Sequence, residues 1–303
     1  MTTTTTTRSK PGPLRVVAAT IAIYLAVMLA LLATLSSLRG AEGGPGFGPQ
    51  VAVVELDGVI LDVDDLVRDL KRHRENPMVR AVVIRINSPG GVVGPTQEVH
   101  QAIQRLRQAG KPVVASLGAI AASGGYYVAV AADQIVANPG TLTGSIGVIM
   151  QMANVEGLLK KVGVDYVVIK AGQFKDVGSF ARPMSPEERR VLQTLLDDVH
   201  SQFISAVAEG RKLDEAEVLK FADGRIFSGS QARRLRMVDT LGGLEDAVNR
   251  AASLAGLPLP PQILPPRRKF SVYDFLKSQL GLPAPSALPG RLPIFKTPLY
   301  LMD

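Results

Sequence analysis

The chain has 303 residues, of which 46% are hydrophobic, and this is enough to bury the core of one or two domains. It has no cysteine, which excludes disulfides, a thiol nucleophile and cysteine-ligated zinc. The net charge of +7 lies at the two ends, and residues 43–261 are neutral overall, so we expect no basic groove for nucleic acid and an affinity of the ends for an anionic membrane surface.

The N-terminal part predicts a membrane anchor. Residues 1–15 form a threonine-rich polar lead that we expect to be disordered in the cytoplasm. Val16–Leu35 has no charge and is long enough to cross a hydrocarbon core of about 30 Å, so we predict an uncleaved transmembrane anchor over residues 16–38 rather than a buried core helix. Three basic residues precede the span, which places the N-terminus inside and the rest of this single-pass protein on the extracytoplasmic side of the cytoplasmic (inner) membrane. Residues 39–50 read as a glycine- and proline-rich linker.

Strand and helix patterns then alternate, which predicts an α/β domain over residues 51–257. Repeated alternation of this kind is typical of a largely parallel sheet covered by helices. The expected strands are residues 51–56, 80–86, 112–117, 134–137, 146–150 and 166–170, and the expected early helices are residues 63–74, 95–108 and a buried one after Ser123.

Ser185 opens the clearest helix of the chain. The sequence Ser-Pro-Glu-Glu has the spacing of a capping box, with proline at the first helical position. An apolar stripe from Val191 to Val207 follows, and we interpret it as core or subunit interface. Shorter helices are expected at residues 214–222, 229–234 and 244–255. Residues 258–303 are rich in proline and predict an extended C-terminal tail.

A serine at a junction between strand and helix is the first candidate for chemistry. Ser123 follows an apolar strand and precedes Gly124 and Gly125, and glycines there allow another part of the backbone to approach closely. A second glycine pair, Gly90 and Gly91, follows the strand 80–86. The N–H groups of such a turn suit an oxyanion site, although an ordinary tight turn explains them equally well.

A serine nucleophile needs a base, and the histidines do not supply one. His73, His100 and His200 each lie on a charged helical segment, and we interpret all three as solvated surface residues that form neither a metal site nor a Ser-His-Asp triad. A lysine serves only if its pKa falls by about 3 units from about 10.4, which requires apolar surroundings without a carboxylate partner. Lys170 and Lys175, in a glycine-containing turn, are the two candidates. An ordinary surface lysine is the alternative for each.

Taken together, four segments resemble the signal peptide peptidase A family of membrane-bound serine peptidases in its short form. The resemblance implies a fold of the Clp-protease/crotonase type, a superhelix of strand-strand-helix units. It also implies peptide-bond hydrolysis by a Ser-Lys dyad, with no cofactor and no metal. The segments are Asn87–Gly91, Ala121–Tyr127, Thr141–Val148 and Lys170–Asp176, in the order of the family's motifs.

The resemblance also assigns roles to individual residues. Ser123 matches the nucleophile and Lys175 the general base, whereas Lys170 matches a motif lysine outside the dyad. Ser145 matches a serine that orients the base. Ala171 replaces the serine usual after the first lysine. The N–H groups that match the oxyanion region are those around Gly90, Gly91 and Gly124.

We therefore expect a membrane-anchored endopeptidase that hydrolyses remnant signal peptides or other hydrophobic, extended peptides. The family also suggests a homo-oligomeric ring whose sites meet at subunit interfaces, with adjacent chains as one source of the dyad partners. Two alternatives stay open. One is a stomatin-operon-type protease that cuts a specific membrane partner protein, and the other is a catalytically silent membrane scaffold of the same fold.

Overall fold

The computed structural model describes residues 21–30, 48–266 and 299–301. The chain divides into residues 1–47 and 48–303. In the first part, residues 21–30 are helical. No helix among the described residues has both the length and the apolar character that a membrane span needs. The predicted lead, most of the predicted anchor at 16–38 and most of the tail lie outside the described residues.

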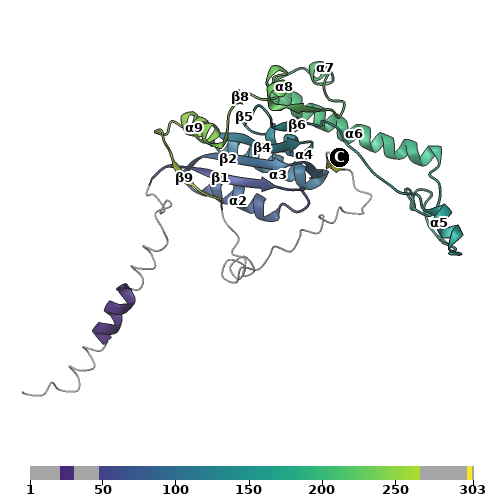
Figure 1. Ribbon diagram of the computed structural model, residues 1–303, viewed down its shortest axis with the longest axis horizontal. Coiled ribbons are helices and arrows are strands. Elements are labelled where there is room, and N and C mark those ends of the chain that lie inside the picture. The colour runs from purple at the N-terminus through teal and green to yellow at the C-terminus, as the bar shows by residue number, and fades with distance from the viewer. Residues whose placement is uncertain (1–20, 31–47, 267–298, 302–303) are drawn as a thin grey trace, which may run out of the picture. The chain divides into compact units, whose positions relative to one another are not determined.

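A mostly parallel sheet forms the centre of residues 48–303 (Figure 1). Its main path runs β7-β6-β4-β2-β1-β9, with β5 beside β4 and β8 beside β5. Every pair is parallel except β6 with β7. The strands are β1 (Gln50–Asp57), β2 (Val79–Ser88), β4 (Val113–Ala122), β5 (Gln134–Ala137), β6 (Leu142–Gly144), β7 (Ile226–Ser228), β8 (Thr240–Leu241) and β9 (Gln262–Leu264).

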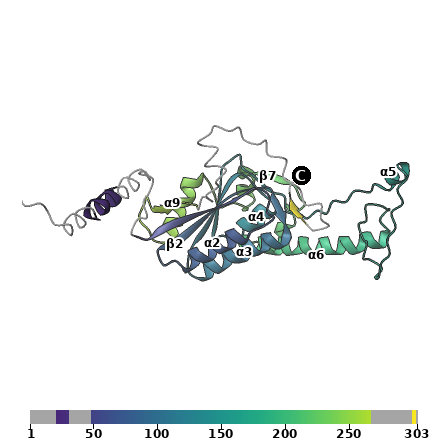
Figure 2. The same ribbon diagram turned by 90° about the horizontal axis from the view of Figure 1, so that it is seen from below.

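Helices cover both faces of this sheet, as Figure 2 shows. Alternate residues of a strand point to opposite faces. Accordingly, Ala52 and Val54 of β1 join the core beneath α2, α3 and α4, whereas Val51 and Val53 pack with α9. The helices are α2 (Asp64–Glu75), α3 (Val93–Gln108), α4 (Gly124–Ala129), α5 (Glu156–Lys161), α6 (Pro186–Arg211), α7 (Glu215–Val218), α8 (Gly229–Arg234) and α9 (Leu244–Leu254).

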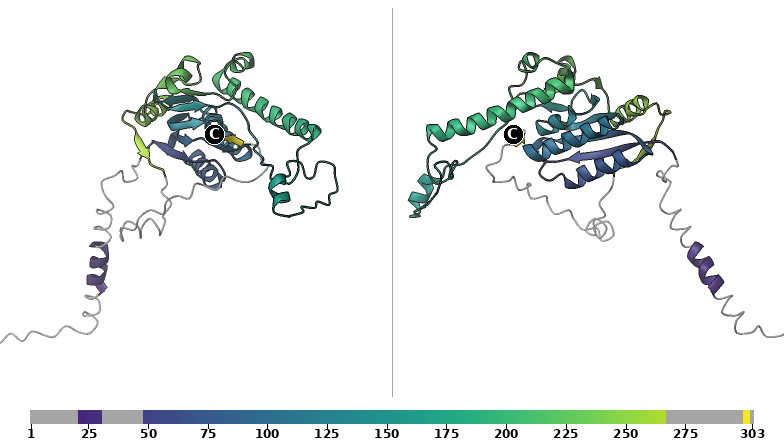
Figure 3. Two further views of the ribbon diagram at one scale, coloured as in Figure 1. Left: turned by 45° about the vertical axis from the view of Figure 1, so that its right-hand side comes forward. Right: turned by 180° about the vertical axis from the view of Figure 1, so that it is seen from behind.

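One part of the chain extends away from this body. Residues 151–185, which we call the arm, carry α5 and lead into α6, and both views of Figure 3 show them projecting beyond the sheet. The capping box at Ser185 is present, and it fixes where α6 begins. Along α6, Val191 and Leu195 are exposed near the arm, whereas Phe203 and Val207 are buried in the body. The apolar stripe is therefore core only in its C-terminal half.

Two predicted strands are wrong. Residues 146–150 form no strand element, because the chain pairs with β4 earlier, through β6. Residues 166–170 lie on the arm and join no sheet of the described residues. Their apolar side chains suggested a buried strand, but Val167 is 80% and Ile169 is 97% exposed. The mixed α/β class and the other predicted strands are confirmed.

Candidate active site

Ser123 lies where β4 ends and α4 begins. Its backbone has φ 53° and ψ −118°, a left-handed conformation that is unusual for a residue with a side chain. Its N–H donates to the Gly144 carbonyl at 2.8 Å, and its own carbonyl accepts from Tyr127 at 2.9 Å. The backbone of Ser123 is thus held from both β6 and α4. Strain of this kind often accompanies a functional residue.

The Ser123 hydroxyl is buried, and among the described residues its hydrogen bonding is incomplete. Ser123 is 0% exposed, and its Oγ has no hydrogen-bond partner within the described part of the chain. Buried hydroxyl groups are normally satisfied, because leaving one unpaired costs about 1–3 kcal/mol. An unpartnered buried hydroxyl is consistent with a site that an additional group completes.

Glycines allow the turn after β2 to touch the start of α4. A Cβ on Gly124 would lie 3.2 Å from both Gly90 Cα and Gly91 N, and one on Gly125 would lie 2.7 Å from the Ser88 carbonyl oxygen. Side chains at these two positions would push the two backbones apart. The structure thus brings three predicted oxyanion residues, Gly90, Gly91 and Gly124, together beside Ser123.

The hydrogen bonds of this turn distinguish its two glycines. Gly90 has φ 107°, its N–H donates to Ser88 Oγ at 3.1 Å, and its carbonyl accepts from Ile60 N at 2.9 Å. Val92 N donates to the Ile60 carbonyl at 2.8 Å. Since backbone groups alternate sides along a strand, the N–H and C=O of Gly91 face away from Ile60. Gly91, rather than Gly90, therefore offers an N–H to a ligand, and its oxyanion role stays a prediction.

An extended piece of this same chain lies on that free side. Strand β10 (Leu299–Leu301) pairs antiparallel with β3 (Gly90–Val92), with Tyr300 opposite Gly91. β10 also lies against α4 (Figure 1). The edge of β3 beside the nucleophile candidate thus accepts an extended peptide by strand addition, a recurring mode of peptide recognition.

Ser145 follows β6, next to the strand that ends at Ser123. It is 8% exposed, has φ 51°, and donates its N–H to the Arg225 carbonyl at 2.8 Å. Because Ala122 pairs with Gly144, the two serines leave neighbouring strands at the same end. A cavity of about 740 Å³ adjoins Ser145 and is also lined by Leu196 and His200.

Lys175 lies apart from these residues. It is exposed on the arm, in a turn where its N–H donates to the Gly172 carbonyl at 3.2 Å. No hydrogen bond or ion pair of its Nζ occurs among the described residues. Lys170 pairs instead with Asp176. A single chain therefore does not bring Lys175 to Ser123, and the assignment of the dyad stays a prediction.

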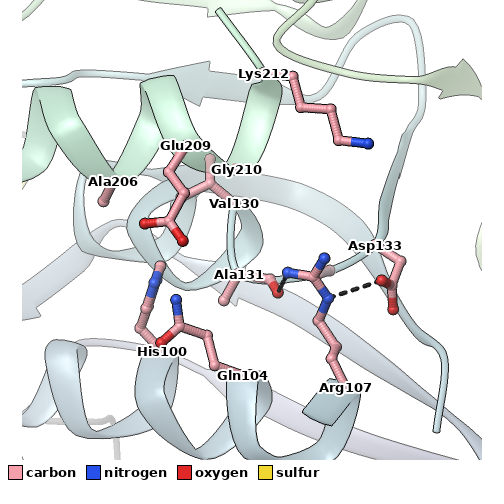
Figure 4. A pocket seen from close by; sticks show the side chains of 11 residues that line it. His100, Gln104, Arg107, Val130, Ala131, Asp133, Ala206, Glu209, Gly210 and Lys212 are labelled. Carbon is pink, nitrogen blue, oxygen red and sulfur yellow. Dashed lines mark hydrogen bonds and ion pairs between the residues drawn. The ribbon is translucent and has the colours of Figure 1, made fainter. Parts of the chain in front are cut away.

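The interpretation of His100 as a surface residue is wrong. His100 is 8% exposed, its ring lies 4.9 Å from the Tyr127 ring, and its Nδ1 donates to the Tyr127 carbonyl at 2.9 Å. Burial lowers its pKa. In the sequence, the polar neighbours of His100 on α3 suggested a surface position. Figure 4 shows Gln104 and Arg107 lining the same small cavity of about 160 Å³ as His100, with Arg107 paired to Asp133.

The other histidines are only partly buried, at positions 73 and 200. Neither is hydrogen-bonded to the unpartnered Ser123 hydroxyl. Across the described residues, no cluster of histidine, aspartate and glutamate is arranged to hold a metal ion.

The close approach at Gly91 leads to a stability prediction. A Cβ there would lie 2.1 Å from the Ile60 carbonyl oxygen, so Gly91→Ala should lower the free energy of unfolding by about 1–3 kcal/mol. Gly94→Ala is the matched control, because no atom lies within 4 Å of its added Cβ and alanine favours α3. Urea unfolding of both variants measures the difference. Equal stability of the two would contradict the packing described here.

Known proteins share this site's part of the chain. The sequence model of peptidase family S49 matches residues 105–258, which include Ser123, Ser145 and Lys175. A Synechocystis protein named "Putative protease slr0021" is 48% identical over 209 residues, covering 69% of this chain and 75% of that protein. Protease 4 of Salmonella typhi is 36% identical over 219 residues, 69% of this chain and 35% of its own length.

A protein of Enterococcus faecium named "Putative signal peptide peptidase SppA" is 34% identical over 213 residues, 66% of this chain and 62% of that protein. This chain therefore spans about a third of protease 4 and less than two thirds of the Enterococcus protein. The family match covers Ser123, Gly124 and the whole arm. The chain belongs to peptidase family S49.

Proposed function

We propose that this protein is a serine-type endopeptidase in which Ser123 is the nucleophile and Lys175 the general base. The observation that carries the proposal is the buried, unpartnered Ser123 hydroxyl beside a strand edge that already holds an extended segment. The Clp-protease/crotonase type of superhelix agrees with the mixed sheet and its helices. Membership of a peptidase family supplies the reaction class.

The mechanism follows from the groups around the serine. A peptide adds to the edge of β3, which presents its carbonyl carbon to Ser123. A neutral Lys175 amine takes the hydroxyl proton during attack and returns it to the leaving amine, after which water hydrolyses the acyl-enzyme. The N–H groups of Gly91 and Gly124 stabilise the oxyanion. Ser145 orients the lysine.

The base comes from an adjacent subunit in this proposal. Lys175 lies on the arm, whose apolar side chains Leu158, Val167 and Ile169 are exposed in the single chain. Exposed apolar surface of this kind marks a contact between proteins. A homo-oligomeric ring covers the arm and inserts each Lys175 into a neighbour's site. The buried hydroxyl of Ser123 then gains the partner that one chain lacks.

The substrates in this proposal are remnant signal peptides and other hydrophobic, extended peptides at the outer face of the cytoplasmic membrane. The uncharged segment Val16–Leu35 anchors the enzyme there. A stomatin-operon-type protease that cuts one specific membrane protein uses the same site. Trapping an intact partner protein on an inactive variant would favour that second function.

A serine-directed acylating probe tests the proposal against a silent scaffold. The purified, assembled protein is incubated with a sulfonyl fluoride, and the modified residue is identified by peptide mass spectrometry. Labelling at Ser123 is expected because only an activated serine reacts, and Ser123→Ala should remain unlabelled. Folded, assembled protein that never reacts at Ser123 would instead support the scaffold.

A further inference from the structure

A network of charged side chains holds the turn that carries Lys175. Asp176 accepts from Lys170 Nζ at one carboxylate oxygen and from Arg182 Nε at the other, the second at 2.9 Å. Arg182 also forks onto Glu188 through both of its terminal nitrogens. Lys170 additionally donates to the Gln173 carbonyl at 2.9 Å. The network therefore ties both ends of the turn to the first residues of α6.

The network is partly shielded from water, which strengthens its interactions. The side chains of Asp176 and Glu188 are 13% and 6% exposed, and those of Lys170 and Arg182 are 34% and 35% exposed. Arg182 and Lys170 hold the pKa of Asp176 far below its usual range, and Arg182 with the Ser185 N–H lowers that of Glu188 to about 2. Both carboxylates are therefore ionised at any pH at which a lysine base could act.

Lys175 stands out within this network because its amine has no anionic partner there. Its nearest carboxylate in sequence is Asp176, and both oxygens of that carboxylate are occupied. Glu188 is taken by Arg182, and Glu187 accepts from Gln173 Nε2 at 3.1 Å. These are the carboxylates that hydrogen-bond to the turn or to Arg182. Two cations, Lys170 and Arg182, balance two anions, Asp176 and Glu188.

We infer that Lys170 and Arg182 are positioning residues for the base: they hold the Asp176 carboxylate away from Lys175, so that the lysine amine is free to lose its proton. The inference rests on the proposed function of Lys175. A carboxylate paired with an ammonium group stabilises the charged form, and a charged lysine accepts no proton. Without its two cations, Asp176 would become that partner.

Removing either cation tests the inference through the pH dependence of catalysis. The full-length, assembled protein is assayed on an apolar peptide from pH 5 to 11. For Lys170→Met and Arg182→Gln, the acidic limb of the kcat/KM profile should move to higher pH by about one unit, because the released Asp176 stabilises charged Lys175. Activity at pH 7 should fall about tenfold. The plateau at high pH, where the amine is neutral, should stay near the wild-type value.

Two further variants separate this role from a structural one. Adding Asp176→Asn to Lys170→Met removes the one carboxylate that this variant releases, so the acidic limb should return to its wild-type position; Arg182→Gln also releases Glu188 and is not used for this rescue. Lys160→Met is the matched control, since it removes another ion-paired lysine of the arm, bonded to Glu156 instead of Asp176. Its limb should not move.

An equal loss of activity at every pH, or a shifted limb that Asp176→Asn fails to restore, would overturn the inference and leave a purely structural network. Failure of the proposed function has a different signature. In that case Lys175→Ala keeps wild-type kcat/KM in the same assay, and none of the network variants changes the acidic limb.

Discussion

Ser123→Ala is expected to abolish peptide hydrolysis while leaving the fold intact. Loss of the nucleophile of a serine peptidase lowers kcat by about four orders of magnitude or more. The fold should persist because the Ser123 hydroxyl makes no hydrogen bond among the described residues and its site is already fully buried. Alanine also meets the same left-handed backbone strain as serine at φ 53°. Turnover of an apolar peptide and urea unfolding measure the two effects.

Ser253→Ala is the matched control for this substitution. Among the described residues, its hydroxyl bonds only to the Asn249 carbonyl within the same helix, α9, which packs on the opposite face of the sheet from α4. Both its activity and its stability should stay near the wild-type values. Wild-type turnover by Ser123→Ala would end the assignment of the nucleophile. Unfolding of that variant would show instead that the hydroxyl is structural.

Lys175→Ala is expected to remove activity as completely as Ser123→Ala does. A lysine supplied by another chain should restore it. An exposed lysine of the arm contributes nothing to the packing of the body, so the variant should fold and assemble. When it is mixed with Ser123→Ala during assembly, sites form that combine an intact serine with a neighbour's intact lysine. Random mixing of equal amounts should restore about one site in four. The recovered activity of two inactive proteins is the measurement.

The mixing experiment needs proof that subunits exchange, for example by mass spectrometry of intact mixed assemblies. Lys160→Ala mixed with Ser123→Ala serves as a reference, because one of its two components is already active. Mixed assemblies with no recovered activity would contradict the donation of Lys175 between chains. Full activity of Lys175→Ala alone would contradict the dyad itself.

Local patterns predicted much of the body of this protein. The strand Gln134–Ala137 and the helix Gly229–Arg234 have the predicted bounds, and Ser185 caps α6 as its spacing indicates. These segments carry their own signals, namely short apolar runs and capping residues. The glycines around Ser123 were also informative, since each close approach leaves no room for a side chain.

Features set by contacts between distant segments could not be predicted in the same way. The apolar run 166–170 has the composition of a buried strand, but on the arm it joins no sheet among the described residues, and Val167 and Ile169 stay exposed. His100 has charged neighbours in sequence, and only the packing of α3 against Tyr127 buries it. The Asp176 network joins residues from 170 to 188, and no short sequence pattern indicates it. That the Gly91 N–H faces away from Ile60, toward the edge where β10 pairs, follows only from the bonds of Ile60.

The strand addition of β10 to β3 affects any measurement of how tightly this protein holds a peptide. A guest that adds to the same edge must displace Leu299–Leu301, because each backbone N–H and C=O of Gly91 serves one neighbour at a time. A ligand attached to its receptor competes as if it were dissolved at about millimolar concentration. Apparent affinities therefore report an exchange between the tethered segment Leu299–Leu301 and a free peptide. Peptides that pair weakly with β3 fail to displace the tethered segment and are not cleaved.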